Sequence, residues 1–168
     1  MQSSHLGLFP QERAEPRTQY GALCWRLRRD SLQVLLVTSR DTGRWVIPKG
    51  WPHANQDGAN SAAREAWEEA GVEGKVDARC LGVFAYDKVQ PADPSVPCVV
   101  GVYGLRVDRL LRRFPERNQR RRKWFSVEKA AKLVAEPELR ALMLAMRGVL
   151  PMPEATDAAE VSKAPPSA

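Results

Sequence analysis

The segment from Asp57 to Gly71, DGANSAAREAWEEAG, predicts a helix with defined ends. Asp57 is a good N-cap because its carboxylate accepts hydrogen bonds from the free N–H groups of a first helical turn. The alanines that follow favour the helical state. Gly71 is placed to end the helix in the left-handed conformation, which glycine adopts without strain. This segment therefore predicts a helix of about four turns, with alanines fit to pack on a sheet.

Three glutamates crowd the second half of this helix. Glu65, Glu68 and Glu69 stand at positions i, i+3 and i+4, which share one face. Like charges at this spacing cost a few tenths of a kcal/mol each, and the helix dipole disfavours them near the C-terminus. A hard divalent cation such as Mg²⁺ or Mn²⁺ would explain the cluster, because carboxylate oxygens suit such ions. Acidic clusters without a metal are also common on surface helices, so the helix alone leaves both interpretations open.

The opposite face of the helix is expected to pack against the rest of the protein. Its packing residues are predicted to be Ala63, Ala66, Trp67 and Ala70. With these residues turned inward, the glutamates are expected to face out of the core.

Apolar segments on both sides of the helix predict an α/β domain. We expect strands at 20–27, 32–38, 44–47, 75–89, 96–107 and 122–127, and a second helix at 135–150. The segment RRDS between the first two strands predicts a hairpin. Strands come first, then a helix, more strands and a helix, which indicates a mixed sheet rather than a regular βαβ alternation.

The composition of the chain predicts one domain with loose ends. A length of 168 residues suits a single core. Residues 1–17 and 151–168 are rich in Pro, Ala, Ser and charge, so the domain is expected to span 18–150. No apolar run approaches the ~18 residues of a membrane span, and the first residues lack the pattern of a signal peptide. We therefore expect a cytoplasmic protein with no membrane segment.

The net charge of +6 is concentrated in one part of the chain. Nine cationic residues lie between positions 106 and 123, namely Arg106, Arg109, Arg112, Arg113, Arg117, Arg120, Arg121, Arg122 and Lys123. A solvated charge run explains part of this group, and the remainder suits an anionic partner. Nucleic acid, a polyphosphate metabolite and an acidic protein all remain open from charge alone.

A longer pattern surrounds the glutamates and resembles the Nudix box. Gly50 is followed after five residues by Gln56, and after seven more by Arg64 to Val72, REAWEEAGV, within a 23-residue window. The Nudix pattern is G, five residues, E, seven residues, then REUxEExGU, with U a bulky apolar residue. Ala66 is smaller than that apolar residue, and Gln56 replaces the first glutamate. The resemblance implies the Nudix fold, a mixed sheet between α-helices (α/β/α) with a loop-helix-loop motif.

The resemblance also implies roles for the residues of this box. Glu65, Glu68 and Glu69 would hold Mg²⁺ or Mn²⁺, Arg64 would orient a glutamate, and the Gly50 carbonyl would complete the coordination. The activity implied is metal-dependent hydrolysis of a phosphoanhydride. In the family the first glutamate is a supporting residue, so Gln56 is compatible with an enzyme.

Similarity outside the box narrows the expected substrate. The stretches YGALCWR, VTSRDTGRWVIPKGWP and GVFAYDK resemble the Nudix branch that acts on diphosphoinositol polyphosphates and diadenosine polyphosphates. The expected contacts to such a small-molecule polyphosphate are Arg17, Arg40, Arg44, Lys49 and Lys88. The alternatives are nucleotide substrates (ADP-ribose, nucleoside diphosphate derivatives or RNA 5′ ends) and a non-catalytic phosphate or nucleic-acid binding module, which Gln56 keeps open.

The remaining aromatic and histidine residues of interest have structural interpretations. Trp51 walls the pocket or packs against the sheet. His53, in the loop after Gly50, is interpreted as an ordinary loop histidine, with a role at the rim of the pocket as the alternative. Trp124 and Phe125 follow a basic run but lead into a predicted strand. We interpret both as core or half-buried residues rather than a stacking platform, so nucleic acid is possible but not favoured.

Overall fold

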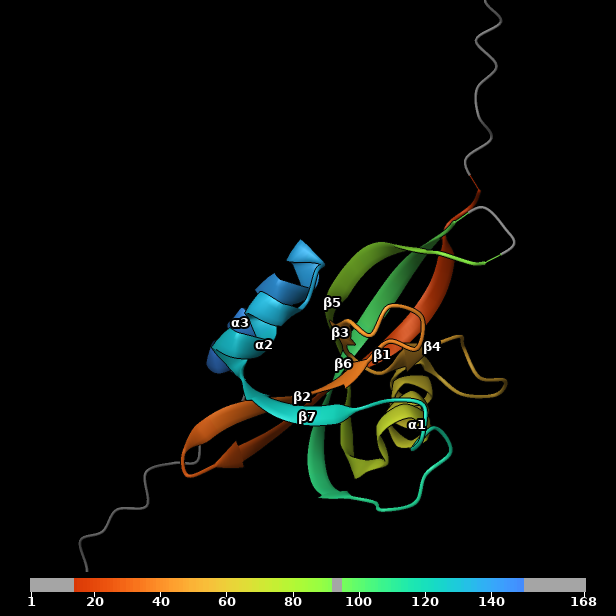
Figure 1. Ribbon diagram of the computed structural model, residues 1–168. Coiled ribbons are helices and arrows are strands. Elements are labelled where there is room, and N and C mark those ends of the chain that lie inside the picture. The colour runs from red at the N-terminus through yellow and green to blue at the C-terminus, as the bar shows by residue number, and fades with distance from the viewer. Residues whose placement is uncertain (1–13, 92–94, 150–168) are drawn as a thin grey trace, which may run out of the picture.

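The computed structural model describes residues 14–91 and 95–149 (Figure 1). The elements in chain order are β1 (Arg17–Arg28), β2 (Ser31–Thr38), β3 (Trp45–Val46), β4 (Lys49–Gly50), α1 (Gly58–Ala70), β5 (Val72–Lys88), β6 (Val96–Leu110), β7 (Arg122–Ser126), α2 (Val127–Leu133) and α3 (Pro137–Val149). Regular structure thus begins at Arg17. The loose segments predicted at 1–17 and 151–168 lie almost entirely outside the described residues.

The first two strands form the predicted hairpin. β1 and β2 pair antiparallel, with Arg28 opposite Ser31, and two residues connect them. Those residues, Arg29 and Asp30, have φ values of 50° and 59°. A two-residue turn with both φ angles positive matches the right-handed twist of the paired strands.

The strands form one mixed sheet of seven strands. Its central order is β3-β2-β1-β6-β5, and β4 and β7 pair with β1 and β2. β1 and β6 are parallel, whereas the other pairs are antiparallel. The predicted mixed sheet is confirmed. The strand predicted at 44–47 is only two residues long, because Pro48 interrupts it.

Helices cover both faces of the sheet, which confirms the α/β/α arrangement (Figure 1). The alanines of α1 pack with Leu35, Val37 and Leu105 on one face. Residues of α2 and α3, including Leu139 and Met143, pack with strand residues on the other face. The helix predicted at 135–150 is observed as α3.

Helix α2 was not predicted from the sequence. Its N-cap is Ser126, whose hydroxyl accepts a hydrogen bond from the Lys129 backbone N–H at 3.3 Å. Glu128 lies in the first turn, where the helix dipole favours a negative charge. The capping residue and this glutamate are the local signals that would have predicted the helix.

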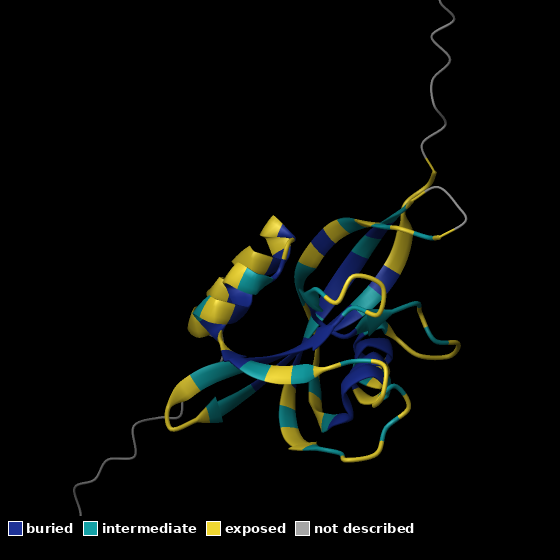
Figure 2. Ribbon diagram, viewed as in Figure 1, coloured by how far each residue is buried: buried dark blue, intermediate teal, exposed yellow. Residues whose placement is uncertain are grey.

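Helix α1 has the predicted ends, and Ala66 and Ala70 are buried as predicted, but other residues of the helix face differently from the prediction. Asp57 accepts from the Asn60 N–H, and Gly71 is left-handed with φ 63°. Glu65 and Glu69, however, are only 8% and 6% exposed, and Trp67 is 39% exposed. Much of the α1 ribbon is coloured as buried in Figure 2. The prediction that these two glutamates face out of the core and that Trp67 packs inward is therefore wrong. Helical spacing defines which residues share a face but not which face is buried.

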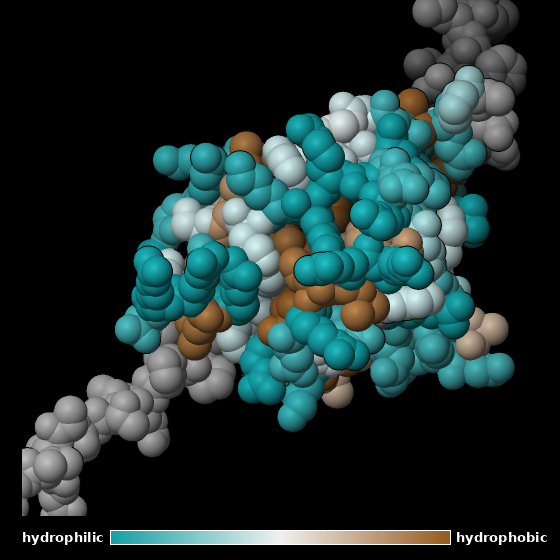
Figure 3. Space-filling model, turned by 60° about the horizontal axis from the view of Figure 1, so that its bottom comes forward, coloured by the Kyte–Doolittle hydropathy of each residue, from teal (hydrophilic) through white to brown (hydrophobic). Residues whose placement is uncertain are grey.

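Most of the surface seen in Figure 3 is hydrophilic, and apolar side chains gather near its middle. No helix in the described part of the chain is both long and apolar enough to span a bilayer.

Candidate active site

Glu65 lies at the centre of the site because Gly50 leaves room for it. A Cβ atom at Gly50 would collide with the carboxylate of Glu65. His53, in the loop between β4 and α1, places Nε2 2.7 Å from Glu65 Oε1. Burial raises the pKa of Glu65, and the hydrogen bond with His53 acts in the opposite direction. Strand β4 and the loop that follows it thus contact the carboxylate of Glu65 on α1.

Glu68 is held by its neighbour on the helix. Arg64 Nε donates to Glu68 Oε1 at 3.0 Å, an i, i+4 pair on the outer side of α1. Glu68 is half-buried, so its other oxygen can reach a ligand in solution. The role of Arg64 in orienting a glutamate for catalysis stays a prediction.

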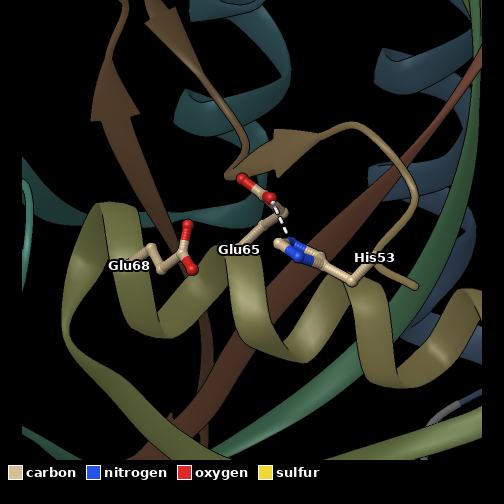
Figure 4. Close-up of side chains that lie close together, drawn as sticks. All are labelled: His53, Glu65 and Glu68. Carbon is tan, nitrogen blue, oxygen red and sulfur yellow. Dashed lines mark hydrogen bonds and ion pairs between the residues drawn. The ribbon is translucent and has the colours of Figure 1, made fainter. Parts of the chain in front are cut away.

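His53, Glu65 and Glu68 converge on one small space (Figure 4). One potential ligand atom from each lies within 4.8 Å of the others. Two carboxylates and an imidazole at this separation are suited to a divalent cation, and carboxylate oxygens are ligands for Mg²⁺ and Mn²⁺. The predicted loop histidine is therefore part of the cluster.

Glu69 belongs to a neighbouring ion pair rather than to this group of three. Arg120 Nη2 donates to Glu69 Oε1 at 3.0 Å, and the Lys49 backbone N–H donates to Oε2 at 3.4 Å. Burial raises the pKa of Glu69 to about 8, although the charges of Arg120 and Lys49 act in the opposite direction. The sequence predicted that Glu69 would lie with Glu65 and Glu68. In the structure, the two carboxylate oxygens of Glu69 instead contact Arg120 and the Lys49 N–H.

Two arginines of the basic run are structural. Arg120 is almost buried and also contacts Glu116 and the Thr38 carbonyl. Arg122 donates to the carbonyls of Ala70 and Leu111, which places a cation at the C-terminus of α1. The charge of Arg120 favours the ionised form of Glu69 and so opposes the effect of its burial. The contacts of Arg120 and Arg122 also remove two cations from the surface predicted to meet an anionic partner.

Lys49 lies next to Glu69 and to the aromatic ring of Tyr86. Its Nζ lies 4.6 Å from the centre of the Tyr86 ring, and Tyr86 Oη donates to Gln19 Oε1 at 2.6 Å. Burial lowers the pKa of Lys49, whereas the carboxylate of Glu69 raises it. Lys49 is thus a half-buried cation next to Glu69.

Trp51 brings together two cations that are distant in the sequence. The guanidinium of Arg17 lies 4.2 Å from the centre of the indole ring, and Lys88 Nζ lies 4.9 Å from it. Trp51 directly follows Gly50, the residue that packs against the Glu65 carboxylate. That Trp51 forms a wall of the pocket stays a prediction.

Arg40 and Arg44 already have acidic partners. Arg40 Nη1 lies 3.2 Å from Glu116 Oε1, and Arg44 Nη1 lies 2.7 Å from Glu136 Oε1. The second pair is the less exposed, because the Glu136 side chain is only 7% exposed. These two arginines are therefore less available to a phosphate than Arg17, Lys49 and Lys88.

Gln56, where the box has its first glutamate, is exposed in the loop before α1. It shares an open hollow with Ala63, Arg64 and Trp67 on the outer side of the helix. Its backbone N–H donates to the His53 carbonyl at 3.2 Å. A change at this position would act on the cluster through Arg64 or through the loop that carries His53.

Residues 17–146 match the NUDIX domain family. The chain belongs to the Nudix family. Among curated Nudix relatives, human diphosphoinositol polyphosphate phosphohydrolase 3-alpha is 38% identical over 114 residues, which cover 67% of this chain and 65% of that protein. The match thus spans slightly less than two thirds of that relative.

Solved Nudix structures show the same fold. A Caenorhabditis elegans Ap4A hydrolase aligns with a TM-score of 0.57 and 18% identity, over 80% of this chain and 98% of that one. The NUDIX domain of Shewanella oneidensis NrtR, solved with ADP ribose, aligns with a TM-score of 0.61 and 14% identity, over 86% and 95% of the two chains. At these identities the similarity supports the fold alone.

Two residues of this Nudix site were not predicted as such. His53 was interpreted as a loop histidine, and its spacing from Glu65 gave no helical or strand relationship to interpret. Arg120 lay within a run of arginines, where its neighbours have the same charge and composition. Only the folded chain distinguishes the arginine that contacts Glu69 from those that face solvent.

Proposed function

We propose that this Nudix protein is a metal-dependent hydrolase of phosphoanhydride bonds in highly phosphorylated small molecules. Its preferred substrates are proposed to be diphosphoinositol polyphosphates, diadenosine polyphosphates or both. The observation that carries the proposal is that Gly50, which packs against Glu65 of the His53, Glu65 and Glu68 cluster, has Lys49 and Trp51 as its chain neighbours. The Lys49 ammonium lies over Tyr86, and Trp51 contacts the cations of Arg17 and Lys88. Cleavage of a phosphoanhydride needs both features, because charge develops on several phosphate oxygens at once.

The residues present fit a divalent ion. Glu65 and Glu68 would hold it through oxygen, with the Gly50 carbonyl and Glu69 as further ligands, and His53 would keep Glu65 oriented. The space that Gly50 leaves for the Glu65 carboxylate supports this assignment. When bound, Mg²⁺ or Mn²⁺ would polarise phosphate oxygens and lower the pKa of a water molecule.

The cations of the chain would bind the rest of the substrate. Hydrolysis adds water across a P–O–P link, forming one P–O bond as another breaks and leaving a phosphate on each product. Lys49, nearest to Glu69, is proposed to bind a phosphate next to the cleaved bond. Arg17 and Lys88, on either side of Trp51, are proposed to bind more distant phosphates. Arg40 and Arg44 would contribute only after leaving Glu116 and Glu136.

The identity of the substrate rests on two independent observations. The relative at 38% identity is named as a diphosphoinositol polyphosphate phosphohydrolase. The chain carries a net charge of +6, which suits a substrate dense in phosphate. The similarity to the Ap4A hydrolase supports the fold alone. Diadenosine polyphosphates are therefore proposed as substrates alongside diphosphoinositol polyphosphates, and neither class is placed above the other. A cytoplasmic location is proposed with them.

The test is product analysis with the full chain in Mg²⁺ or Mn²⁺. The panel contains a diphosphoinositol polyphosphate, diadenosine hexaphosphate, ADP-ribose and a 5′-triphosphate RNA, with the Glu68→Gln protein as the control. Turnover of either of the first two, lost in the control, is expected. Preference for ADP-ribose or RNA would retain the chemistry and overturn the substrate. No turnover with either metal would favour a binding module, the interpretation that Gln56 keeps open.

A further inference from the structure

A second site is suggested by a cavity between α3 and the far part of the sheet. Its volume is about 350 Å³, and its lining includes Trp25 from β1, Leu81 from β5, and Leu142 and Met146 from α3. The α3 residues place it on the face opposite α1, away from Glu65 and Glu68. Cavities that bind small molecules begin at about this volume.

Apolar residues form the base of the cavity, and a glycine among them leaves open space. Gly104 of β6 lies at its floor, where an added Cβ would stand 3.6 Å from Leu81 and 3.9 Å from the Trp25 indole nitrogen. Both are ordinary contact distances, so an added Cβ would fit there without collision. Trp25 is 9% exposed and has one N–H donor beside this gap. The glycine therefore leaves space that the fold itself does not require.

Cations surround the opening of the cavity. Lys75, Arg79 and Arg106 line it, against one acidic residue, Asp77. All four side chains belong to exposed residues. Asp77 Oδ1 already accepts from the Arg79 backbone N–H at 2.9 Å, and Arg106 has only a distant partner, Asp108, at 3.7 Å. The rim thus carries a surplus of positive charge over an apolar floor.

We propose that this cavity binds a small amphipathic anion. Its apolar body would lie against Trp25, Leu81 and Met146, and its acidic group would lie between Arg79 and Arg106. The two halves of the lining have complementary chemistry to such a ligand, and neither half alone specifies it. This site is separate from the proposed hydrolytic centre, so neither proposal depends on the other.

Two fluorescent probes test the proposal. 8-Anilinonaphthalene-1-sulfonate carries an aromatic body and one negative charge, and N-phenyl-1-naphthylamine has the same rings without the charge. With the full folded chain, the anion is expected to bind more tightly than the neutral probe. Arg106→Gln and Arg79→Gln are each expected to weaken binding of the anion by about two- to fivefold at low salt, with little effect on the neutral probe. Arg112→Gln, an exposed arginine outside the lining, is the matched control and should change neither.

Two filling variants test the location. Gly104→Leu places a side chain in the gap, and Ala145→Trp fills the cavity from an exposed position on α3. Both are expected to abolish binding of both probes while leaving the melting transition cooperative. Glu68→Gln should bind the anion as the natural chain does. Equal binding of both probes, or binding that survives Ala145→Trp in a folded protein, would overturn the proposal.

Discussion

Arg120 and Glu69 form a nearly buried ion pair, with Nη2 3.0 Å from Oε1 and side chains 9% and 8% exposed. The pair joins the segment before β7 to helix α1, 51 residues away in the sequence. A carboxylate buried at this depth is costly unless it is paired and hydrogen-bonded. The arginine therefore offsets part of the cost of burying Glu69, whereas Glu65 has His53 as its partner.

The raised pKa of Glu69 predicts a specific pH dependence of stability. The unfolded carboxyl loses its proton near pH 4.5, whereas the folded one retains it to about pH 8. Between these values the folded state binds more protons, so the free energy of unfolding falls as the pH rises, by at most about 1.4 kcal/mol per unit. Glu69→Gln removes this contribution and still accepts from Arg120. In chelator, the variant should gain stability relative to the natural chain from pH 4.5 to 8.

Denaturant titrations at several pH values measure this difference. A difference that stays constant with pH would show that Glu69 is ionised throughout in the folded state. Added Mg²⁺ should make the loss of stability end at a lower pH, because bound metal favours the charged carboxylate and so lowers the pKa of Glu69 in the folded state.

Glu68→Gln is expected to lower turnover by at least about 100-fold. Changes to residues that only support a metal ligand cost up to about 100-fold, and Glu68 is proposed to be a ligand itself. The melting temperature should stay the same or rise, because one of three repelling charges is removed. Glu138→Gln, in the first turn of α3, is the matched control. A Glu68→Gln protein with full activity would remove this residue from the mechanism.

Gly50→Ala tests whether the position of the Glu65 carboxylate matters. The added methyl group collides with that carboxylate, so we expect weaker metal binding and lower turnover. Gly148→Ala adds the same group where nothing lies within 4 Å and should not reduce activity. Isothermal titration with Mn²⁺ separates a loss of metal affinity from a loss of fold. Unchanged affinity in Gly50→Ala would mean that Glu65 does not hold the ion.

Trp51→Leu should raise KM for a polyphosphate substrate roughly fivefold or more while changing kcat less. The indole holds both Arg17 and Lys88, and each cation–π contact at an exposed site is worth about 0.5–1 kcal/mol. Trp67→Leu, an exposed tryptophan on α1, is the aromatic control. If steady-state kinetics gave the same KM for both variants, Trp51 would have no specific role in substrate binding.

Gln56→Glu restores the first glutamate of the Nudix box. Activity is expected to stay equal or rise by up to about tenfold, since the new carboxylate lies near Arg64 on the outer side of α1. Asn55→Asp adds the same charge one residue earlier, at a left-handed position that aspartate tolerates. Initial rates at saturating metal compare the two. A large loss in Gln56→Glu alone would indicate that the glutamine has a role of its own.

Local chemistry explains the parts of the fold that were predicted. The ends of α1 follow from Asp57 and Gly71, because a cap acts on hydrogen bonds within its own turn. The hairpin of β1 and β2 follows from the apolar segments on either side of RRDS, since neighbours in sequence pair with little loss of chain entropy. Helix α2 was missed because it is only seven residues long, too short for a clear apolar period.

The sequence by itself determined the acidic box, the ends of its helix and the order of strands and helices, because each depends on residues close together in the chain. Tertiary structure alone decided which face of α1 is buried, that His53 joins Glu65, and that Arg120 rather than another arginine meets Glu69. These relationships join residues from different elements. Their energies depend on distance and burial in the folded chain, and neither quantity is a property of residue order.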